Sequence, residues 1–156
     1  MLADPELSPF AMPQIRPMAL ADYDAVIALV QQTPGVSVRD ADSREATARY
    51  LARNPGLSFV ACDADGALVG CVMSGHDGRR GYLQHLAVLP AQRRRGLANA
   101  LVDHCLGALA ALGIQKTHID VFKTNALAQA YWASQGWLLR EDIHRYSFTR
   151  PGHPIA

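Results

Sequence analysis

The sequence predicts one α/β domain of the α+β type, in which helices cover a mostly antiparallel sheet. The expected order is strand, helix, helix, three strands, helix, strand, helix and strand, which lacks the strict alternation of a doubly wound fold. The chain has 156 residues, 49% of them hydrophobic, so it can bury one substantial core. No repeat, low-complexity tract or convincing linker divides it. We therefore expect a domain over 13–148, a flexible leader at 1–12 and a tail at 149–156.

The first third of the chain is expected to hold one strand and two helices. Residues 14–18 have the pattern of a strand. Asp22 is placed to cap a helix whose apolar residues recur on one face until Pro34 stops it. Asp42, with a glutamate three residues later, resembles a capping box for a second helix that runs through Arg53.

Turn residues mark the boundaries of the other elements. Glycine-containing turns separate three strands, and Pro90 ends the third of these. Leucines at helical spacing then continue to Gly113, which predicts a long helix. The expected elements are strands at 57–62, 68–74 and 82–89, a helix at 96–112, a strand at 115–122, a helix at 126–135 and a last strand within 137–148.

The run Arg93-Arg94-Arg95-Gly96-Leu97-Ala98 is the strongest functional signal, because it lies between a strand and the long helix. A helix N-terminus has unpaired backbone N–H groups and a partial positive charge, so it favours an anion. Glycine and alanine let a ligand approach the backbone, and guanidinium groups suit phosphate oxygens. The P-loop and dinucleotide fingerprints are absent. The run therefore predicts a diphosphate site, with a solvated surface or a nucleic-acid patch as the alternatives.

Composition limits these alternatives. The net charge of +1 argues against a general nucleic-acid binder. Cys62, Cys71 and Cys105 have no metal-ligand or redox spacing and are expected to be buried, reduced thiols. The histidines are too scattered to predict a metal site, so no metal is expected. Residues 1–10 resemble neither a signal peptide nor a membrane span, so we expect a cytoplasmic protein without a membrane partner.

Two motifs in the expected order resemble the GCN5-related N-acetyltransferase (GNAT) family. Arg93-x-x-Gly96-x-Ala98 is similar to the family signature after the fourth strand, and Asn125-x-x-Ala128 followed by Gly136-Trp137 resembles its second element. The resemblance covers residues 14–147. It implies a mixed, mostly antiparallel sheet of six to seven strands, with two splayed parallel strands at its centre and about four helices. It also implies acetyl-coenzyme A (acetyl-CoA) as cosubstrate and direct transfer to a primary amine of a small molecule, a protein N-terminus or a lysine.

The resemblance also assigns residues to the acetyl-CoA site. The splay would separate Leu86-Ala87-Val88 from 120–122, and the backbone of Leu86 and Val88 would pair with the pantetheine arm. Asn125, expected to cap a helix, would bond to the same arm. A homodimer stays open. The expected binding residues are Leu86, Ala87, Val88, Arg93, Arg94, Arg95, Gly96, Leu97, Ala98, Asn99, Asn125 and Trp132.

Acyl transfer to an amine needs a base, because a lysine-like amine with a pKa of about 10.4 is a cation at neutral pH. His85 is the main candidate, since imidazole titrates near neutrality and the residue lies on the strand beside the expected thioester. Strict alternation puts His85 on the face of Leu83 and Ala87, and a structural role competes with the catalytic one. Gln84 can only position water or substrate. A water relay to remote carboxylates is the third option.

The residue that would act as the general acid and protonate the departing thiolate departs from the family pattern. The position seven residues after Asn125, where the family often has a tyrosine, is Trp132, whose indole cannot supply the proton. Tyr131 is adjacent, but one helical step rotates its side chain by about 100°, so a core role competes with an acid role. Water or the substrate ammonium can also protonate the thiolate. The replacement motivates an alternative function, an acyl-CoA-binding regulatory module with little or no catalysis.

The acceptor side is the least determined by the sequence. It is expected between the loop after the first helix and the last strands, where Asp40, Asp42, Glu141 and Asp142 lie. These carboxylates either attract a cationic amine or are solvated caps and rim charges. The fold class alone does not choose the acceptor.

Overall fold

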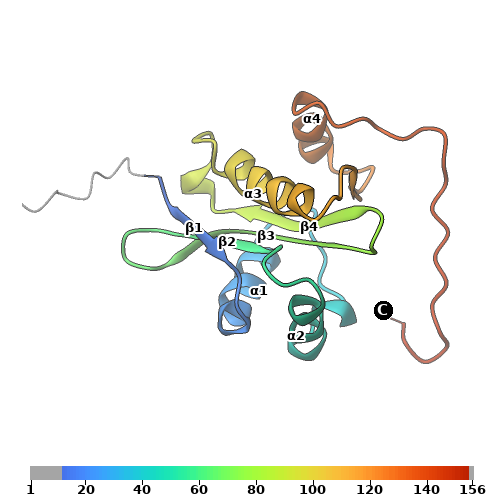
Figure 1. Cartoon of the computed structure of the whole chain (residues 1–156), viewed down its shortest axis with the longest axis horizontal. Coiled ribbons are helices and arrows are strands. Elements are labelled where there is room, and N and C mark those ends of the chain that lie inside the picture. The colour runs from blue at the N-terminus through green and yellow to red at the C-terminus, as the bar shows by residue number, and fades with distance from the viewer. Residues whose placement is uncertain (1–11, 155–156) are drawn as a thin grey trace, which may run out of the picture.

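A computed structural model describes residues 12–154, in which helices cover both faces of one sheet (Figure 1). Helices α1 and α2 lie on one face, and α3 and α4 lie on the other (Figure 1). The helices are α1 (Tyr23–Gln31), α2 (Arg44–Arg53), α3 (Leu97–Ala111) and α4 (Ala126–Ser134). Residues 1–11 of the expected leader lie outside the described residues, and the domain boundaries stay a prediction.

The five strands lie side by side in chain order, and the first four are antiparallel. The last strand pairs in parallel with its neighbour, so the sheet is mixed but mostly antiparallel, as predicted. They are β1 (Gln14–Pro17), β2 (Phe59–Cys62), β3 (Leu68–His76), β4 (Gly81–Val88) and β5 (Thr117–Ile119).

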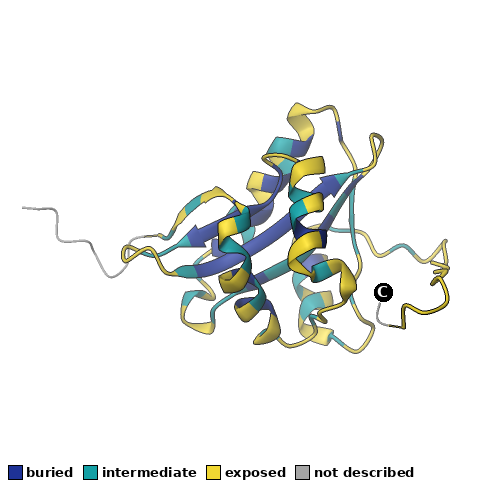
Figure 2. Ribbon diagram, turned by 90° about the horizontal axis from the view of Figure 1, so that it is seen from below, coloured by how far each residue is buried: buried dark blue, intermediate teal, exposed yellow. Residues whose placement is uncertain are grey.

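The core has two layers, one on each face of the sheet, and the buried residues concentrate on the strands and the inner helix faces (Figure 2). Phe59 and Ala61 of β2 pack in the cluster that contains Leu101 of α3. Val60, between them, packs with Val30 of α1 in the other cluster. This alternation is what a strand buried on both faces requires, because successive side chains point to opposite sides.

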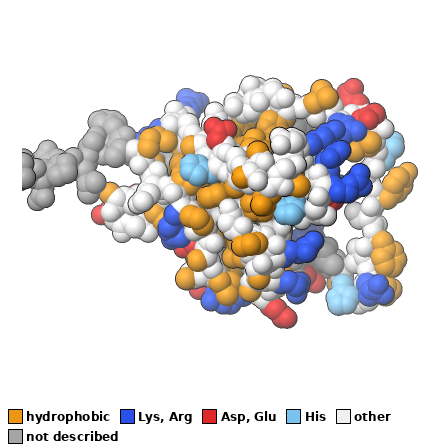
Figure 3. Space-filling view, viewed as in Figure 1, with side chains coloured by type: hydrophobic (Ala, Val, Ile, Leu, Met, Phe, Trp, Pro, Cys, Tyr) orange, Lys and Arg blue, Asp and Glu red, His pale blue; other side chains and the backbone are white. Residues whose placement is uncertain are grey.

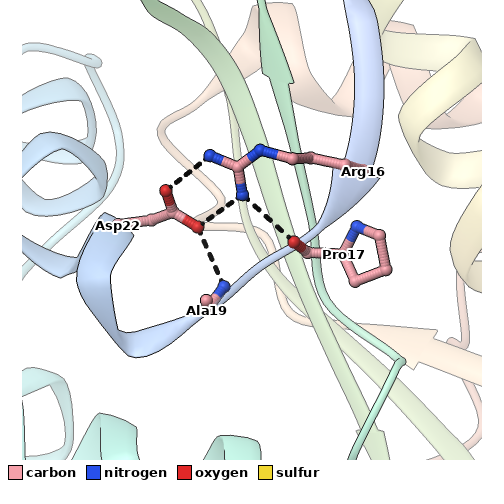
Figure 4. A network of polar contacts seen from close by, with 4 residues as sticks. All are labelled: Arg16, Pro17, Ala19 and Asp22. Carbon is pink, nitrogen blue, oxygen red and sulfur yellow. Dashed lines mark hydrogen bonds and ion pairs between the residues drawn. The ribbon is translucent and has the colours of Figure 1, made fainter.

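The two expected helix caps differ in detail from the prediction. Asp22 precedes α1, but its carboxylate accepts two 2.8 Å hydrogen bonds from Arg16 and one from the Ala19 N–H instead of capping that helix (Figure 4). Ser43, not Asp42, caps α2, with its Oγ accepting the Ala46 N–H at 3.1 Å. Serine is a strong N-cap residue, so its position next to Asp42 frees that carboxylate for another contact.

The Arg16–Asp22 pair gives a prediction about stability. The hydrogen bonds from Arg16 lower the pKa of Asp22 below its usual 3.8. The charged carboxylate therefore stabilises the fold above that value, and the contribution is lost as the pH falls through the lowered pKa. Asp22→Asn should lower the free energy of unfolding by about 1–2 kcal/mol at neutral pH and by less at about pH 3. Urea denaturation at both pH values measures this. Asp24→Asn, at an exposed position of α1, is the control, and an equal loss in both variants would contradict the prediction.

The last expected strand, within 137–148, is not formed in the described chain, and the expected strand at 115–122 is shortened to Thr117–Ile119. After Trp137 the chain runs away from the sheet, and hydrophobic side chains stand along it at the right of Figure 3 (Figures 1 and 3). Its exposed apolar residues include Leu138, Tyr146 and Phe148, and Arg145 contacts Asp120 at 3.2 Å. A strand needs a neighbour to pair its backbone, and this segment pairs with none of the described strands. The sheet therefore has five described strands instead of the expected six to seven.

The three cysteines are free thiols. Cys71 and Cys105 are buried, as expected, and burial raises the pKa of Cys71 to about 12 and that of Cys105 to about 11. Cys62 is only half-buried. Among residues 12–154, no helix has the length and apolar character needed to cross a bilayer.

Candidate active site

A β-bulge in β4 determines which way His85 points. Met73 pairs with Gln84 and Cys71 pairs with Ala87, so the single residue between Cys71 and Met73 faces two residues of β4. One of these two is His85, which has a left-handed φ of +54°. A bulge re-aims side chains because it adds one residue to one strand of the pair.

The bulge also reverses the alternation of β4. Leu83 packs in the cluster beneath α3, whereas Ala87 packs in the cluster beneath α1. The expectation that His85 shares one face with both is therefore wrong. Gln84 and His85 are consecutive, yet both reach the side of α1 and α2: Gln84 lines a pocket with residues of α2, and His85 contacts the loop that precedes this helix.

His85 forms a close polar pair with Asp42. Its Nε2 lies 2.5 Å from Oδ1 of Asp42, and each side chain is only 13% exposed. The second carboxylate oxygen accepts the N–H of Arg39 at 2.8 Å, and the Tyr23 hydroxyl donates to the Asp42 carbonyl at 2.6 Å. A carboxylate only accepts hydrogen bonds, so we assign the ring proton to Nε2, which leaves Nδ1 free as an acceptor when the imidazole is neutral.

The charge of Asp42 is stabilised by these contacts. Burial acts to raise its pKa, but the hydrogen bonds from His85 and from the Arg39 N–H outweigh burial, and the pKa falls below its usual 3.8. Asp42 is therefore an anion at neutral pH. It can orient the imidazole and stabilise its protonated form.

The two parallel strands, β4 and β5, separate before β4 reaches His85. Their ladder ends at the pair Leu83 and Ile119, so within residues 12–154 the rest of β4 has no strand partner on the β5 side. The Leu89 N–H bonds to the Val69 carbonyl on the β3 side. Because backbone groups alternate between strand edges, those of Val88 and Leu86 point toward the gap. The ladder therefore ends before 86–88 and 120–122, the segments that the family resemblance implies to be splayed apart.

The arginine run forms the turn between β4 and α3. Arg94 and Gly96 have left-handed φ values of +62° and +81°. Gly96 is the N-cap of α3 and has no side chain to accept the first N–H groups of the helix. A Cβ built on Gly96 meets no atom within 4 Å, so open space lies in front of this turn. Arg93 and Arg94 are exposed, and Arg95 donates to Gln92 Oε1 at 2.7 Å. Such a turn can hold an anion with main-chain donors and guanidinium groups together.

Helix α4 brings its predicted residues to the same end of α3. Asn125 caps α4, with Oδ1 accepting the Ala128 N–H at 3.1 Å. The Tyr131 hydroxyl donates to Asn99 Oδ1, in the first turn of α3, at 2.6 Å. Burial raises the pKa of Tyr131, so the phenol keeps its proton at neutral pH. Trp132 is buried in the core, with its ring 4.6 Å from that of Trp137. Its expected contact with a cofactor stays a prediction.

The structure therefore brings the predicted residues together in two groups. Leu86 and Val88 lie on the part of β4 beyond the ladder, and the turn at 93–96 and Asn99 lie at the start of α3 next to Tyr131, whereas His85 and Gln84 lie on the face of α1 and α2. Sequence reasoning missed the pairing of Asp42 with His85, 43 residues away, because nothing in the sequence predicted the bulge. Among the described residues, no group of three or more His, Cys, Asp or Glu side chains could hold a metal ion.

Comparisons with known proteins add to this geometry. Residues 23–137 match the family described as the acetyltransferase (GNAT) family. An acetyltransferase of Pectobacterium atrosepticum is 36% identical over 112 residues, which span 72% of this chain and 78% of that protein. Ard1 of Thermoplasma volcanium has a TM-score of 0.71 at 18% identity, covering 83% of this chain and 85% of that one. AAC(6')-Iy in complex with a CoA-containing bisubstrate analog has a TM-score of 0.68 at 23% identity, covering 90% and 100%.

Proposed function

This chain belongs to the acetyltransferase (GNAT) family and is an acetyltransferase, and we propose that it transfers the acetyl group of acetyl-CoA directly to a primary amine within a ternary complex. The observation that carries the proposal is the end of the β4–β5 ladder at Leu83 and Ile119, together with the helix N-terminus without a side-chain cap at Gly96, which follows the end of β4. We also propose that the protein is cytoplasmic, because its three cysteines are unpaired, as in a reducing compartment.

The residues at the gap fit an acyl-CoA. Backbone groups of Leu86 and Val88 point toward a strand that has moved away, and the amides of a pantetheine arm have the donors and acceptors to pair with them. The open space at Gly96 and the N–H groups at the start of α3 suit the linked phosphates. Arg93 and Arg94 add charge at the same place, and Asn99 and Asn125 lie at the neighbouring helix starts.

His85 is the proposed base, and Asp42 is the residue that positions it. Bound acetyl-CoA would supply an activated acyl group with a thiolate leaving group. The acceptor arrives as an ammonium ion and loses a proton to Nδ1 of His85, because Nε2 is committed to Asp42. The charged carboxylate then stabilises the imidazolium. The free amine attacks the acyl carbon, and backbone N–H groups of β4 stabilise the developing oxyanion. The C–S bond then breaks, the thiolate takes up a proton, and the nitrogen releases its second proton to solvent.

Tyr131 is the proposed donor of a proton to the departing thiolate. Its phenol is protonated at neutral pH and hydrogen-bonded to Asn99, close to the start of α3. Water and the substrate ammonium are competing donors. The core position of Trp132, where the family often has a tyrosine, favours the second candidate function, a module that binds acyl-CoA with little or no turnover.

Release of the CoA thiol across a panel of primary amines distinguishes the two functions. The panel contains small amines, amino acids and peptides with free N-termini or lysines, with acetyl-CoA as donor. We expect amine-dependent thiol release and a matching acetylated product by mass spectrometry. Hydrolysis without an amine is the blank. Tight CoA binding in a calorimeter, with no release for any amine above that blank, would support the binding module and contradict the transferase mechanism.

A further inference from the structure

A pocket of about 310 Å³ lies on the same face of the sheet as His85, between the end of α2 and the β3–β4 hairpin. This volume is at the lower end of the range for small-molecule sites. Gln84, the neighbour of His85, forms part of its wall. The residues used in the argument are Tyr50, Arg53, Asn54, His76 and Gln84.

The Tyr50 hydroxyl is a donor without a partner. Its oxygen is buried and makes no hydrogen bond in the described structure. Burial also raises the pKa of Tyr50, so the group is a neutral O–H at any physiological pH. A Cβ atom added to Gly75 would lie only 2.8 Å from this oxygen. The backbone of the hairpin at Gly75 therefore packs closely against the phenol. A buried hydroxyl without a partner costs free energy, and an acceptor atom on a ligand would remove that cost.

Two more donors line the same pocket. Arg53, in the last turn of α2, makes no ion pair or hydrogen bond with any described residue. His76 Nδ1 accepts the Gly78 N–H at 2.9 Å, so the neutral ring carries its proton on Nε2. The carboxylate of Asp77, which also lines the pocket, accepts the N–H groups of Arg79 and Arg80 through its Oδ1 and stays an anion.

Asn54 forms part of the pocket wall, but both polar atoms of its side chain already have hydrogen-bond partners. Its Oδ1 accepts the His76 N–H at 3.1 Å, and its Nδ2 donates to the Tyr50 carbonyl at 3.2 Å. The pocket wall therefore contains a guanidinium, an imidazole N–H and the buried Tyr50 O–H, and it includes Gln84, the chain neighbour of His85. Forked donors of this kind match the two oxygens of a carboxylate.

We propose that this pocket selects acceptors in which a carboxylate accompanies the primary amine, as in an amino acid, over amines that lack one. The inference rests on the proposed acetyl transfer, because it makes the pocket the acceptor site. The carboxylate lies toward Arg53 and Tyr50, and the amine lies toward Gln84 and His85. A cationic polyamine has no group for the guanidinium and meets a like charge there.

Matched pairs of amino acids and their decarboxylated amines test this selectivity. The pairs are lysine with cadaverine, ornithine with putrescine, and phenylalanine with phenethylamine. In the wild type, kcat/KM should favour the amino acid by at least about 10-fold. Arg53→Met should reduce this preference about 10-fold by raising the KM of the amino acid more than that of the amine. Arg49→Met, an exposed position one turn earlier on α2, is the matched control and should keep the preference.

Tyr50→Phe separates a binding role from a structural one. Because the hydroxyl has no protein partner, its removal should leave the free energy of unfolding equal or higher, while the KM of the amino acid rises several-fold and that of acetyl-CoA does not change. A loss of stability with an unchanged amino-acid KM would overturn the role of Tyr50.

Calorimetric binding of each pair in the presence of CoA makes the inference independent of turnover. If thiol is released but the decarboxylated amines react as well as the amino acids, or Arg53→Met lowers both equally, the inference fails and the transferase proposal stands. If no amine releases thiol, the transferase proposal fails, and binding alone decides the inference. Binding of the amino acids to the wild type but not to Arg53→Met would support the inference. Equal binding of an amino acid and its decarboxylated amine would refute it.

Discussion

Gly96→Glu is expected to weaken CoA binding by at least about 100-fold, measured as a dissociation constant by calorimetry. Gly96 is the N-cap of α3, and open space lies in front of its Cα. A glutamate would fill that space and put a negative charge where the linked phosphates are proposed to bind. Two like charges about 4 Å apart near a protein surface repel by several kcal/mol, which exceeds the energy equivalent of a 100-fold loss.

Two variants separate this effect from backbone strain. Gly113, just beyond the other end of α3, has a φ of +82° and equally open surroundings, so Gly113→Glu has the same strain far from the proposed site and should bind CoA normally. Ala98→Glu adds the charge inside the first turn, where glutamate suits the helix dipole and no positive φ is required. If Gly96→Glu and Ala98→Glu are folded and bind CoA like the wild type, the phosphate site has been placed at the wrong turn.

His85→Asn is expected to lower kcat by about 100-fold or more, with little change in the affinity for CoA. Asparagine tolerates the left-handed φ of this bulge position, so the backbone is preserved better than by alanine. The variant removes the nitrogen that accepts the proton and the contact with Asp42. The dependence of the rate on pH should change as well, because the proton of the amine must then leave by another route.

The control for this experiment is His104→Asn. His104 is exposed on α3 and bonds only to the Ala100 carbonyl of its own helix, so its loss should leave kcat and the pH profile intact. The kcat of Asp42→Asn should lie between those of His85→Asn and His104→Asn, because this variant keeps the imidazole but removes the charge that orients it. A His85→Asn enzyme with the kcat and the pH profile of the wild type would show that the proton leaves by another route.

Local patterns predicted most of the fold and the turn between β4 and α3. The stop at Pro90, the leucine spacing of α3 and Asn125 as a cap are all encoded within a few residues, and the structure has each of them. The end of the β4–β5 ladder came from the family resemblance. Ser43 was missed as a cap because Asp42 and Glu45 form an equally good local pattern, and Asp42 is instead taken by His85.

Features that depend on distant contacts were not predictable. The bulge at His85 adds one residue to a strand whose sequence contains no glycine or proline at that point, so the alternation of β4 was assigned wrongly. The pocket at Tyr50 needs the end of α2, Gly75 and Gln84 to meet, and each of them looks ordinary in isolation. The expected strand within 137–148 also depends on distant contacts, and this segment pairs with neither edge of the described sheet, so its local pattern alone forms no strand.

The burial of two cysteines has a practical result for kinetic work. Ellman's reagent reacts with thiolates, and the high pKa values of Cys71 and Cys105, together with their burial, keep both groups protonated and out of its reach. Of the three cysteines, only Cys62 can contribute to the absorbance that the reagent gives with the folded protein. Turnover can therefore be followed continuously with this reagent against a small, constant background, without replacing any cysteine.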